Sequence, residues 1–194
     1  MTTPKSPYPN DQRMYPNAGP HIQTPAGTSP GSNGDPRFEA ELYRLAPSRV
    51  TVLIVGGSTP LKHAVARALH ERSPRAPHPF VVFECAETDS ETVELELFGG
   101  PAYAPADAGA IQRTESGTLY VARIDQLPLL LQPRFLRFLD QERQARVVAA
   151  TDSDLVAAVE RGHFRLDLAE RLSLVELVLP DTLEAVYPRG VEHG

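Results

Sequence analysis

The sequence has little cysteine and no long apolar run. Cys85 is the only cysteine among 194 residues, which excludes an internal disulfide and any metal site built from several cysteines. It follows the apolar run 80–83, so we expect it to be a small buried side chain. No apolar stretch approaches the about 18 residues of a membrane helix, and the first residues lack the order of a signal peptide. We therefore expect a cytoplasmic protein without a membrane segment.

Positive charge is also scarce. The chain has 19 lysines and arginines against 25 acidic residues, a net charge of −6 and a pI near 5.5. Affinity for nucleic acid depends on cations that neutralise phosphates, and here the cations are dispersed among acids. Direct DNA binding is therefore not expected.

The first part of the chain is rich in proline. Residues 1–36 contain eight prolines and four glycines, a composition that buries too little apolar area to offset the entropy of ordering the chain. We predict a disordered Pro-rich tail over 1–46, a folded core over 47–180 and a flexible C-terminal tail over 181–194.

Beyond the tail, apolar runs alternate with stretches of helical periodicity. Such alternation predicts right-handed crossovers and a parallel sheet covered on both faces. The expected fold is therefore a three-layer α/β domain with five parallel strands. Strands are expected at 50–55, 80–83, 118–124, 146–150 and 173–179, and helices around 61–69, 93–98, 128–141, 153–160 and 164–172.

The segment 56–63 resembles half of a phosphate-binding loop. Gly56 and Lys62 have the spacing of G-x-x-x-x-G-K-[ST], but Leu61 stands at the second glycine and His63 at the Ser/Thr. Pro60 lacks an N–H, and leucine resists the left-handed backbone that glycine adopts, so much of the phosphate cradle should be lost. We expect no bound cofactor, with weak ATP or ADP binding left open.

Two interpretations of this segment remain open. In the simpler one, Thr59 caps an ordinary amphipathic helix and Pro60 occupies its first turn. In the other, Gly56, Gly57 and Lys62 are what remains of a nucleotide site. The second is favoured by Lys62 being one of only two lysines in the chain, beside seventeen arginines.

Taken together, the ordered segments resemble the central AAA+ domain of sigma-54-dependent transcriptional activators. The resemblance covers about 52–180 and implies a P-loop NTPase core, degenerate and truncated, without the helical lid of the family. The segments that carry it are 65–70 (VARALH), 73–75 (SPR), 96–99 (ELFG), 117–120 (GTLY), 127–128 (LP), 136–139 (LRFL), 149–151 (AAT) and 164–172 (FRLDLAERL).

Departures from the family pattern argue against catalysis. The family has an Asp-Glu pair at the end of the third strand for magnesium and the attacking water, whereas this chain has Ala122 and Arg123. We therefore predict no catalytic residues, no metal and no ATP hydrolysis. Asp125 is a substitute only if the strand shifts in register. The family's sigma-contacting loop, expected within 100–108, is shorter and lacks its Phe-Thr-Gly core.

Arg165 and Arg171 match, by resemblance, the arginines that reach a neighbouring subunit's nucleotide. They are therefore candidates for arginine fingers that act in trans. The alternative is that both form intramolecular ion pairs, with Asp167 or Glu170 as partners. Thr151 stands at the family's polar sensing position, and a helix cap is the other interpretation.

The leading hypothesis is a pseudo-ATPase that regulates or scaffolds through a protein partner, such as an intact AAA+ activator or a signalling complex. A second hypothesis is a nucleotide sensor in which Lys62 and Arg123 together hold phosphate without a metal. The third is an ATP-binding sigma-54-type transcriptional regulator, which the resemblance to the family implies.

Overall fold

A parallel five-stranded sheet forms the centre of the computed structural model, which describes residues 36–85, 89–100, 108–141, 145–180 and 183. The strand order is β2-β3-β4-β1-β5, and every neighbouring pair is parallel. The predicted fold class is therefore confirmed. The strands are β1 (Val52–Val55), β2 (Phe80–Glu84), β3 (Thr118–Ala122), β4 (Arg146–Ala150) and β5 (Glu176–Val178).

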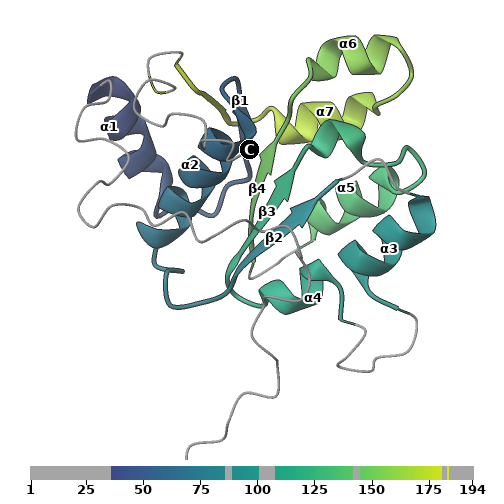
Figure 1. Cartoon of the computed structure of the whole chain (residues 1–194), viewed down its shortest axis with the longest axis horizontal. Helices are drawn as coiled ribbons and strands as arrows, with labels where there is room; N and C mark the ends of the chain where they lie inside the picture. Colours follow the sequence, from purple (N-terminus) through teal and green to yellow (C-terminus); the bar gives the residue numbers. More distant parts are fainter. Residues whose placement is uncertain (1–35, 86–88, 101–107, 142–144, 181–182, 184–194) are drawn as a thin grey trace, which may run out of the picture.

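Helices cover both faces of the sheet (Figure 1). One face packs on α1 and α2, and the other packs on the layer that contains α3, α4, α5, α6 and α7. The helices are α1 (Pro36–Leu45), α2 (Thr59–Glu71), α3 (Ser90–Phe98), α4 (Ala110–Thr114), α5 (Gln132–Asp140), α6 (Leu155–Glu160) and α7 (Leu166–Leu172), with a 3-10 turn η2 (Ile124–Gln126).

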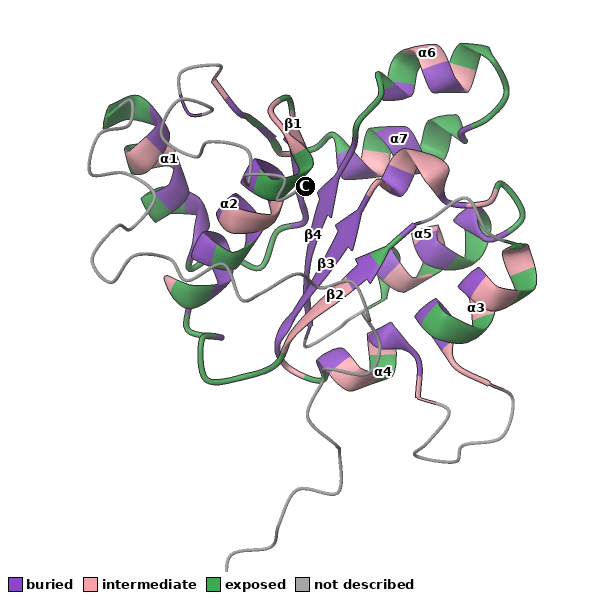
Figure 2. Cartoon of the chain, in the orientation of Figure 1, coloured by how far each residue is buried: buried purple, intermediate pink, exposed green. Residues whose placement is uncertain are grey.

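The central strands are buried on both faces, as Figure 2 shows for β3 and β4. Successive side chains of a strand point to opposite faces, so β4 supplies both cores. Val147 and Ala149 join the core under α3 to α7, whereas Val148 and Ala150 join the core under α1 and α2. Cys85 is fully buried in the first core, as expected, and burial raises the pKa of its thiol.

The structure moves one boundary that matters for the site. A strand was expected to continue to residue 124, but β3 ends at Ala122. Arg123 adopts the left-handed conformation, with φ 52° and ψ 47°, and η2 follows it. This conformation turns the chain sharply at the end of the strand, and it costs roughly 1–2 kcal/mol for a residue other than glycine. The short helix α4 was not anticipated.

The prediction of a disordered tail up to residue 46 is wrong for 36–45, which form α1. Phe38 and Leu42 of this helix are buried in the core that covers α2. Its carboxyl end is fixed by the fully buried Arg146, whose guanidinium donates to the carbonyls of Leu45 (3.0 Å) and Ala46 (2.9 Å). The proline-rich composition of 1–36 gave no sign of the amphipathic helix that begins at Pro36.

The remaining tail predictions fall mostly outside the described residues. Residues 1–35, 181–182 and 184–194 are not described, and neither is the segment that would hold a lid. Leu183, which is described, is buried in the core under α1 and α2. Within the described ranges, no helix is both long and apolar enough to cross a membrane.

Candidate functional site

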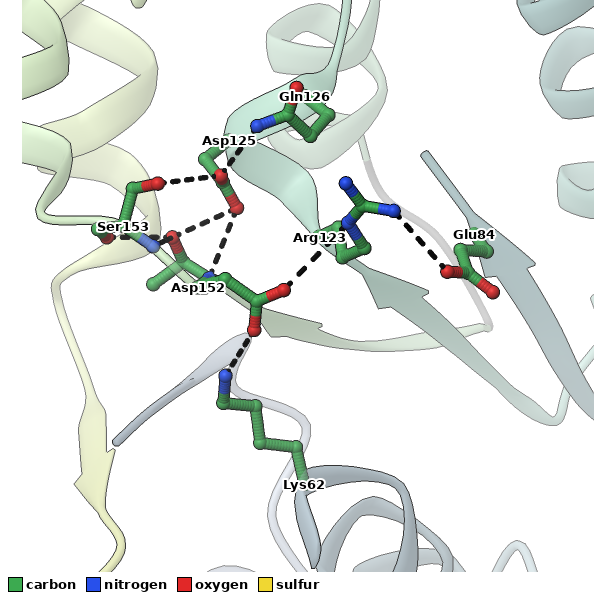
Figure 3. Close-up of polar contacts among 8 residues, drawn as sticks. Lys62, Glu84, Arg123, Asp125, Gln126, Asp152 and Ser153 are labelled. Carbon is green, nitrogen blue, oxygen red and sulfur yellow. Dashed lines mark hydrogen bonds and ion pairs between the residues drawn. The ribbon is translucent and has the colours of Figure 1, made fainter. Parts of the chain in front are cut away.

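The candidate site lies where the carboxyl ends of β1, β3 and β4 meet. Parallel strands end at the same edge of a sheet, and ligand crevices of open α/β sheets lie beyond that edge. The loop after β1 reaches α2, β3 leads into Arg123 and η2, and β4 leads into the turn 151–154. Figure 3 shows side chains from these three segments pointing toward one another.

The loop after β1 keeps its glycines but is closed on its apolar side. Gly56 (φ 78°) and Gly57 (φ 65°) both use the left-handed backbone that glycine adopts easily. Leu61 is fully buried and lies against Gly57 together with Leu179, so a Cβ on Gly57 would stand 3.0 Å from Leu61 Cδ2. The loop therefore packs against the apolar side chains of Leu61 and Leu179.

The start of α2 follows the simpler interpretation in outline. Pro60 lies in the first turn, as expected, but the cap position belongs to Ser58 and not to Thr59. The Ser58 side chain makes no capping hydrogen bond. The helix therefore begins without a side-chain cap, and Pro60 sets the backbone conformation of its first turn.

His63 points away from the crevice. Its ring stacks on Tyr120 at 5.6 Å and on Phe80 at 6.0 Å between centroids. Burial lowers the pKa of His63, and the nearby Arg67 lowers it further. A Ser/Thr at this position of a phosphate loop would supply a hydroxyl for magnesium, whereas His63 is part of an aromatic stack on the sheet.

Lys62 points into the site and is held by a carboxylate. Its side chain is only 4% exposed, and its ammonium forms an ion pair with Oδ1 of Asp152. The other oxygen of Asp152, Oδ2, lies 3.7 Å from Nε of Arg123. Nη1 of Arg123 lies 3.8 Å from Oε1 of Glu84. Four alternating charges therefore run from α2 across the ends of β4, β3 and β2.

Asp125 holds the turn after β4 in place. Its Oδ1 accepts from Thr151 Oγ1 and from the Asp152 N–H, each at 3.1 Å. Its Oδ2 accepts from Ser153 Oγ and from Gln126 Nε2, each at 2.9 Å. Burial raises the pKa of Asp125, but these donors outweigh burial, so the pKa lies below its ordinary value. This carboxylate is saturated with donors, which leaves it poorly suited to replace a metal ligand.

The end of β3 offers no carboxylate of its own. Ala122 is buried, and Arg123 turns its guanidinium toward Asp152 and Glu84. Among the described residues, no group of three or more His, Cys, Asp or Glu side chains could hold a metal ion.

A cavity of about 470 Å³ opens beside the buried end of Lys62. It lies between the loop at 56–57 and the turn 151–155, over Leu53 and Val55 of β1. Its size suits a small organic ligand. The crevice expected at this edge of the sheet is therefore present, and both Lys62 and Asp152 line it.

The predicted residues are only partly brought together. Gly56, Gly57 and Lys62 line one cavity, and Arg123 is connected to Lys62 through Asp152; that these four residues bind a nucleotide stays a prediction. Sequence reasoning missed Asp152, although its place directly after β4 put it at the same sheet edge. It also missed Glu84, the last residue of β2.

Arg165 and Arg171 lie on the helical layer, each in an intramolecular ion pair. Arg165 forms a bidentate ion pair with Asp167, with Nη2 2.7 Å from Oδ2 and Nε 3.0 Å from Oδ1, as the alternative interpretation expected. Arg171 pairs with Asp140 of α5 at 2.9 Å, and not with Glu170.

Thr151 is a turn-forming residue in this structure. Its hydroxyl shares one hydrogen between Asp125 Oδ1, at 3.1 Å, and the Ser153 carbonyl, at 2.8 Å, and it accepts from the Ser153 N–H. The cap of α6 is Asp154, whose side chain accepts from the Val156 N–H at 2.9 Å. Thr151 therefore does not cap the helix, and its hydroxyl joins the network that orients Asp152.

Sequence comparisons show which known proteins this chain is similar to. The profile of the Sigma-54 interaction domain matches residues 36–178. The regulatory protein AtoC of Escherichia coli K12 is 39% identical over 71% of this chain and 33% of its own length. The sigma54-dependent transcriptional regulator SfnR of Pseudomonas fluorescens is 37% identical over 75% of this chain and 45% of its own. The chain thus spans less than half of these relatives.

Solved structures agree on the fold. NtrX from Brucella abortus in complex with ATP superposes with a TM-score of 0.68 at 31% identity, over 74% of this chain and 36% of NtrX. A P-loop NTPase domain of a sigma-54 transport activator from E. coli superposes with a TM-score of 0.58 over 74% of this chain and 93% of that domain. At 20% identity, this second likeness supports the fold alone.

Proposed function

Because the chain belongs to the Sigma-54 interaction domain family, we propose that it is a relative that does not hydrolyse ATP and that regulates or scaffolds through protein contact. One observation carries the proposal most of all. The end of β3 presents Ala122 and a guanidinium at the place where the resemblance implies a metal-binding and a water-orienting carboxylate.

Physical magnitudes support the loss of hydrolysis. Phosphoryl transfer is catalysed chiefly by positioning and by neutralising charge, for which a metal ion is the usual means. Loss of a general base alone costs about 10²–10⁴ in rate. Lys62, the cation of the phosphate loop, is already paired with Asp152, and Leu61 closes the loop against Leu179. These effects act on the same site.

The test is ATP turnover with and without magnesium, compared with Lys62→Ala. Purified protein should show a rate equal to that of the variant and insensitive to magnesium. Magnesium-dependent turnover that disappears in Lys62→Ala would contradict the proposal, because it would require an intact phosphate loop. The variant also serves as the control for a contaminating ATPase.

The partner in this proposal is a protein, with an intact AAA+ activator as the first candidate. Arg165 and Arg171 supply the contact face, since their side chains are 43% and 28% exposed. Exposed ion pairs are weak, so a partner carboxylate or phosphate can replace Asp167 or Asp140 at little cost. The proposal includes no direct DNA contact, in keeping with the net charge of −6.

This contact is tested by measuring binding to an intact sigma-54 activator with bound ATP analogue. Charge reversal at both positions, Arg165→Glu with Arg171→Glu, should abolish the complex. Arg137→Glu, which reverses one charge on the exposed side of α5, is the matched control for each of the two single replacements and should leave the complex intact. Equal binding by both variants would show that the contact face lies elsewhere.

A second candidate function is nucleotide sensing without metal. It is favoured by the cavity of about 470 Å³ beside Lys62 and by the similarity to NtrX, whose structure was solved in complex with ATP. Calorimetry with ATP or ADP in EDTA separates the two candidates. Heat that saturates below millimolar ligand supports the sensor, and its absence removes it.

A further inference from the structure

We propose that Asp152 is a built-in competitor for phosphate, whose carboxylate occupies the anion position formed by Lys62 and Arg123. This inference rests on the proposed function and specifies how the site is kept closed. The class of ligand that is excluded is inorganic phosphate and the terminal phosphates of nucleotides.

The geometry is that of one anion between two cations. Oδ1 of Asp152 pairs with the ammonium of Lys62, and Oδ2 lies 3.7 Å from Nε of Arg123. Carboxylate and phosphate are recognised by the same charge-assisted hydrogen bonds from lysine and arginine. Asp152 therefore makes contacts that a phosphate oxygen pair would otherwise make.

Burial explains why an anion is needed here. The Lys62 side chain is 4% exposed, whereas the Asp152 side chain is 39% exposed. A buried ammonium without a counter-ion is strongly unfavourable, but a half-exposed carboxylate can remain hydrated. Loss of Asp152 thus leaves the buried Lys62 without its partner and creates a demand for an anion from solution.

The turn after β4 keeps the competitor oriented. The N–H of Asp152 donates to Asp125, which also accepts from the hydroxyls of Thr151 and Ser153. Three contacts thus fix the backbone on both sides of Asp152. A tethered and oriented group acts at high effective concentration, so free phosphate at millimolar levels competes poorly with it.

The decisive experiment is titration with inorganic phosphate in EDTA, followed by calorimetry and by the shift in melting temperature. Wild-type protein should show no saturable binding up to tens of millimolar. Asp152→Ala should bind phosphate at least about tenfold more tightly than wild type, because the internal competitor is gone. Adding Lys62→Ala to that variant should abolish the gain.

Glu176→Gln is the matched control. Glu176 lines the same cavity from β5, and it takes part in none of the ion pairs found among the described residues. Its replacement removes the same charge, so it should leave phosphate binding as weak as in wild type. A gain as large in Glu176→Gln, or a gain that persists without Lys62, would overturn the proposal.

Asp152→Asn covers the case in which the alanine variant does not fold. It keeps the shape of the side chain and removes its charge, so it should also gain phosphate binding, by a smaller factor. Absence of a gain in the folded variant refutes the competitor. The outcome is independent of the turnover assay, since ATP hydrolysis by wild type would refute the proposed function whatever phosphate does.

Discussion

Replacing Asp125 with asparagine should loosen the turn that carries Asp152. The carboxylate has two donors on each oxygen: Asp152 N–H, Ser153 Oγ and Gln126 Nε2 donate to it fully, and Thr151 shares its hydroxyl hydrogen between it and the Ser153 carbonyl. Asparagine keeps one carbonyl oxygen, so two donors lose their acceptor and the other two lose a charged one. At about 1 kcal/mol net for each lost hydrogen bond, the free energy of unfolding should fall by about 2–3 kcal/mol.

The assay is urea denaturation of wild type and Asp125→Asn across a range of pH. The pKa of Asp125 in the folded state lies below its ordinary value of 3.8. A depressed carboxyl pKa stabilises the fold fully above the ordinary pKa, and this contribution is lost as pH falls through the folded-state pKa. The difference between the two proteins should therefore be complete at pH 7 and should shrink below about pH 4.

A surface carboxylate provides the control. Asp140→Asn breaks an exposed ion pair with Arg171, so it should cost less than about 1 kcal/mol. Equal losses for Asp125→Asn and Asp140→Asn would refute the role given to Asp125. So would a difference that stays constant as the carboxyl group of wild type becomes protonated.

Other consequences can be tested by denaturation. Gly117→Ala should cost more than about 3 kcal/mol, because a Cβ there would lie 1.9 Å from the Pro79 carbonyl oxygen, whereas Gly162→Ala, with φ +72° and open space around it, should cost about 1–2 kcal/mol. Arg146→Met should cost about 3 kcal/mol and raise hydrogen exchange in α1, because the carbonyls of Leu45 and Ala46 at its carboxyl end lose their guanidinium donor, although the Leu45 carbonyl keeps other donors, from Ser48. Burial lowers the pKa of His63, so the free energy of unfolding should fall between pH 7 and pH 5, and His63→Phe should reduce that slope.

The fold could be predicted because its signals are local and repeated. Apolar runs such as 80–83 and 146–150 mark strands buried on both faces, and the intervening periodic segments mark helices. Helix α1 was missed because the composition of the proline-rich segment was extended over it, although its three buried residues, Phe38, Leu42 and Leu45, have the i, i+4, i+7 spacing of a helix. Its place depends on Arg146, which is about a hundred residues away in the sequence.

The candidate site was less accessible to sequence reasoning. Lys62 and Arg123 follow different strands, and the shared sheet edge was enough to predict their meeting. The role of Asp152 depends on a turn whose direction is set by Asp125, and such side-chain contacts across loops leave no periodic signal. The left-handed backbone at Arg123, which aims its guanidinium at that carboxylate, likewise has no mark in the sequence.

The anchoring of α1 by Arg146 sets the minimal length of any fragment meant to fold. A protein trimmed to begin at β1 would keep the buried guanidinium of Arg146 but would lose the carbonyl oxygens of Leu45 and Ala46, which accept its hydrogen bonds. Truncation studies of this region should therefore keep the chain from Pro36 onward, because Arg146, the first residue of β4, needs the end of α1 for its hydrogen bonds.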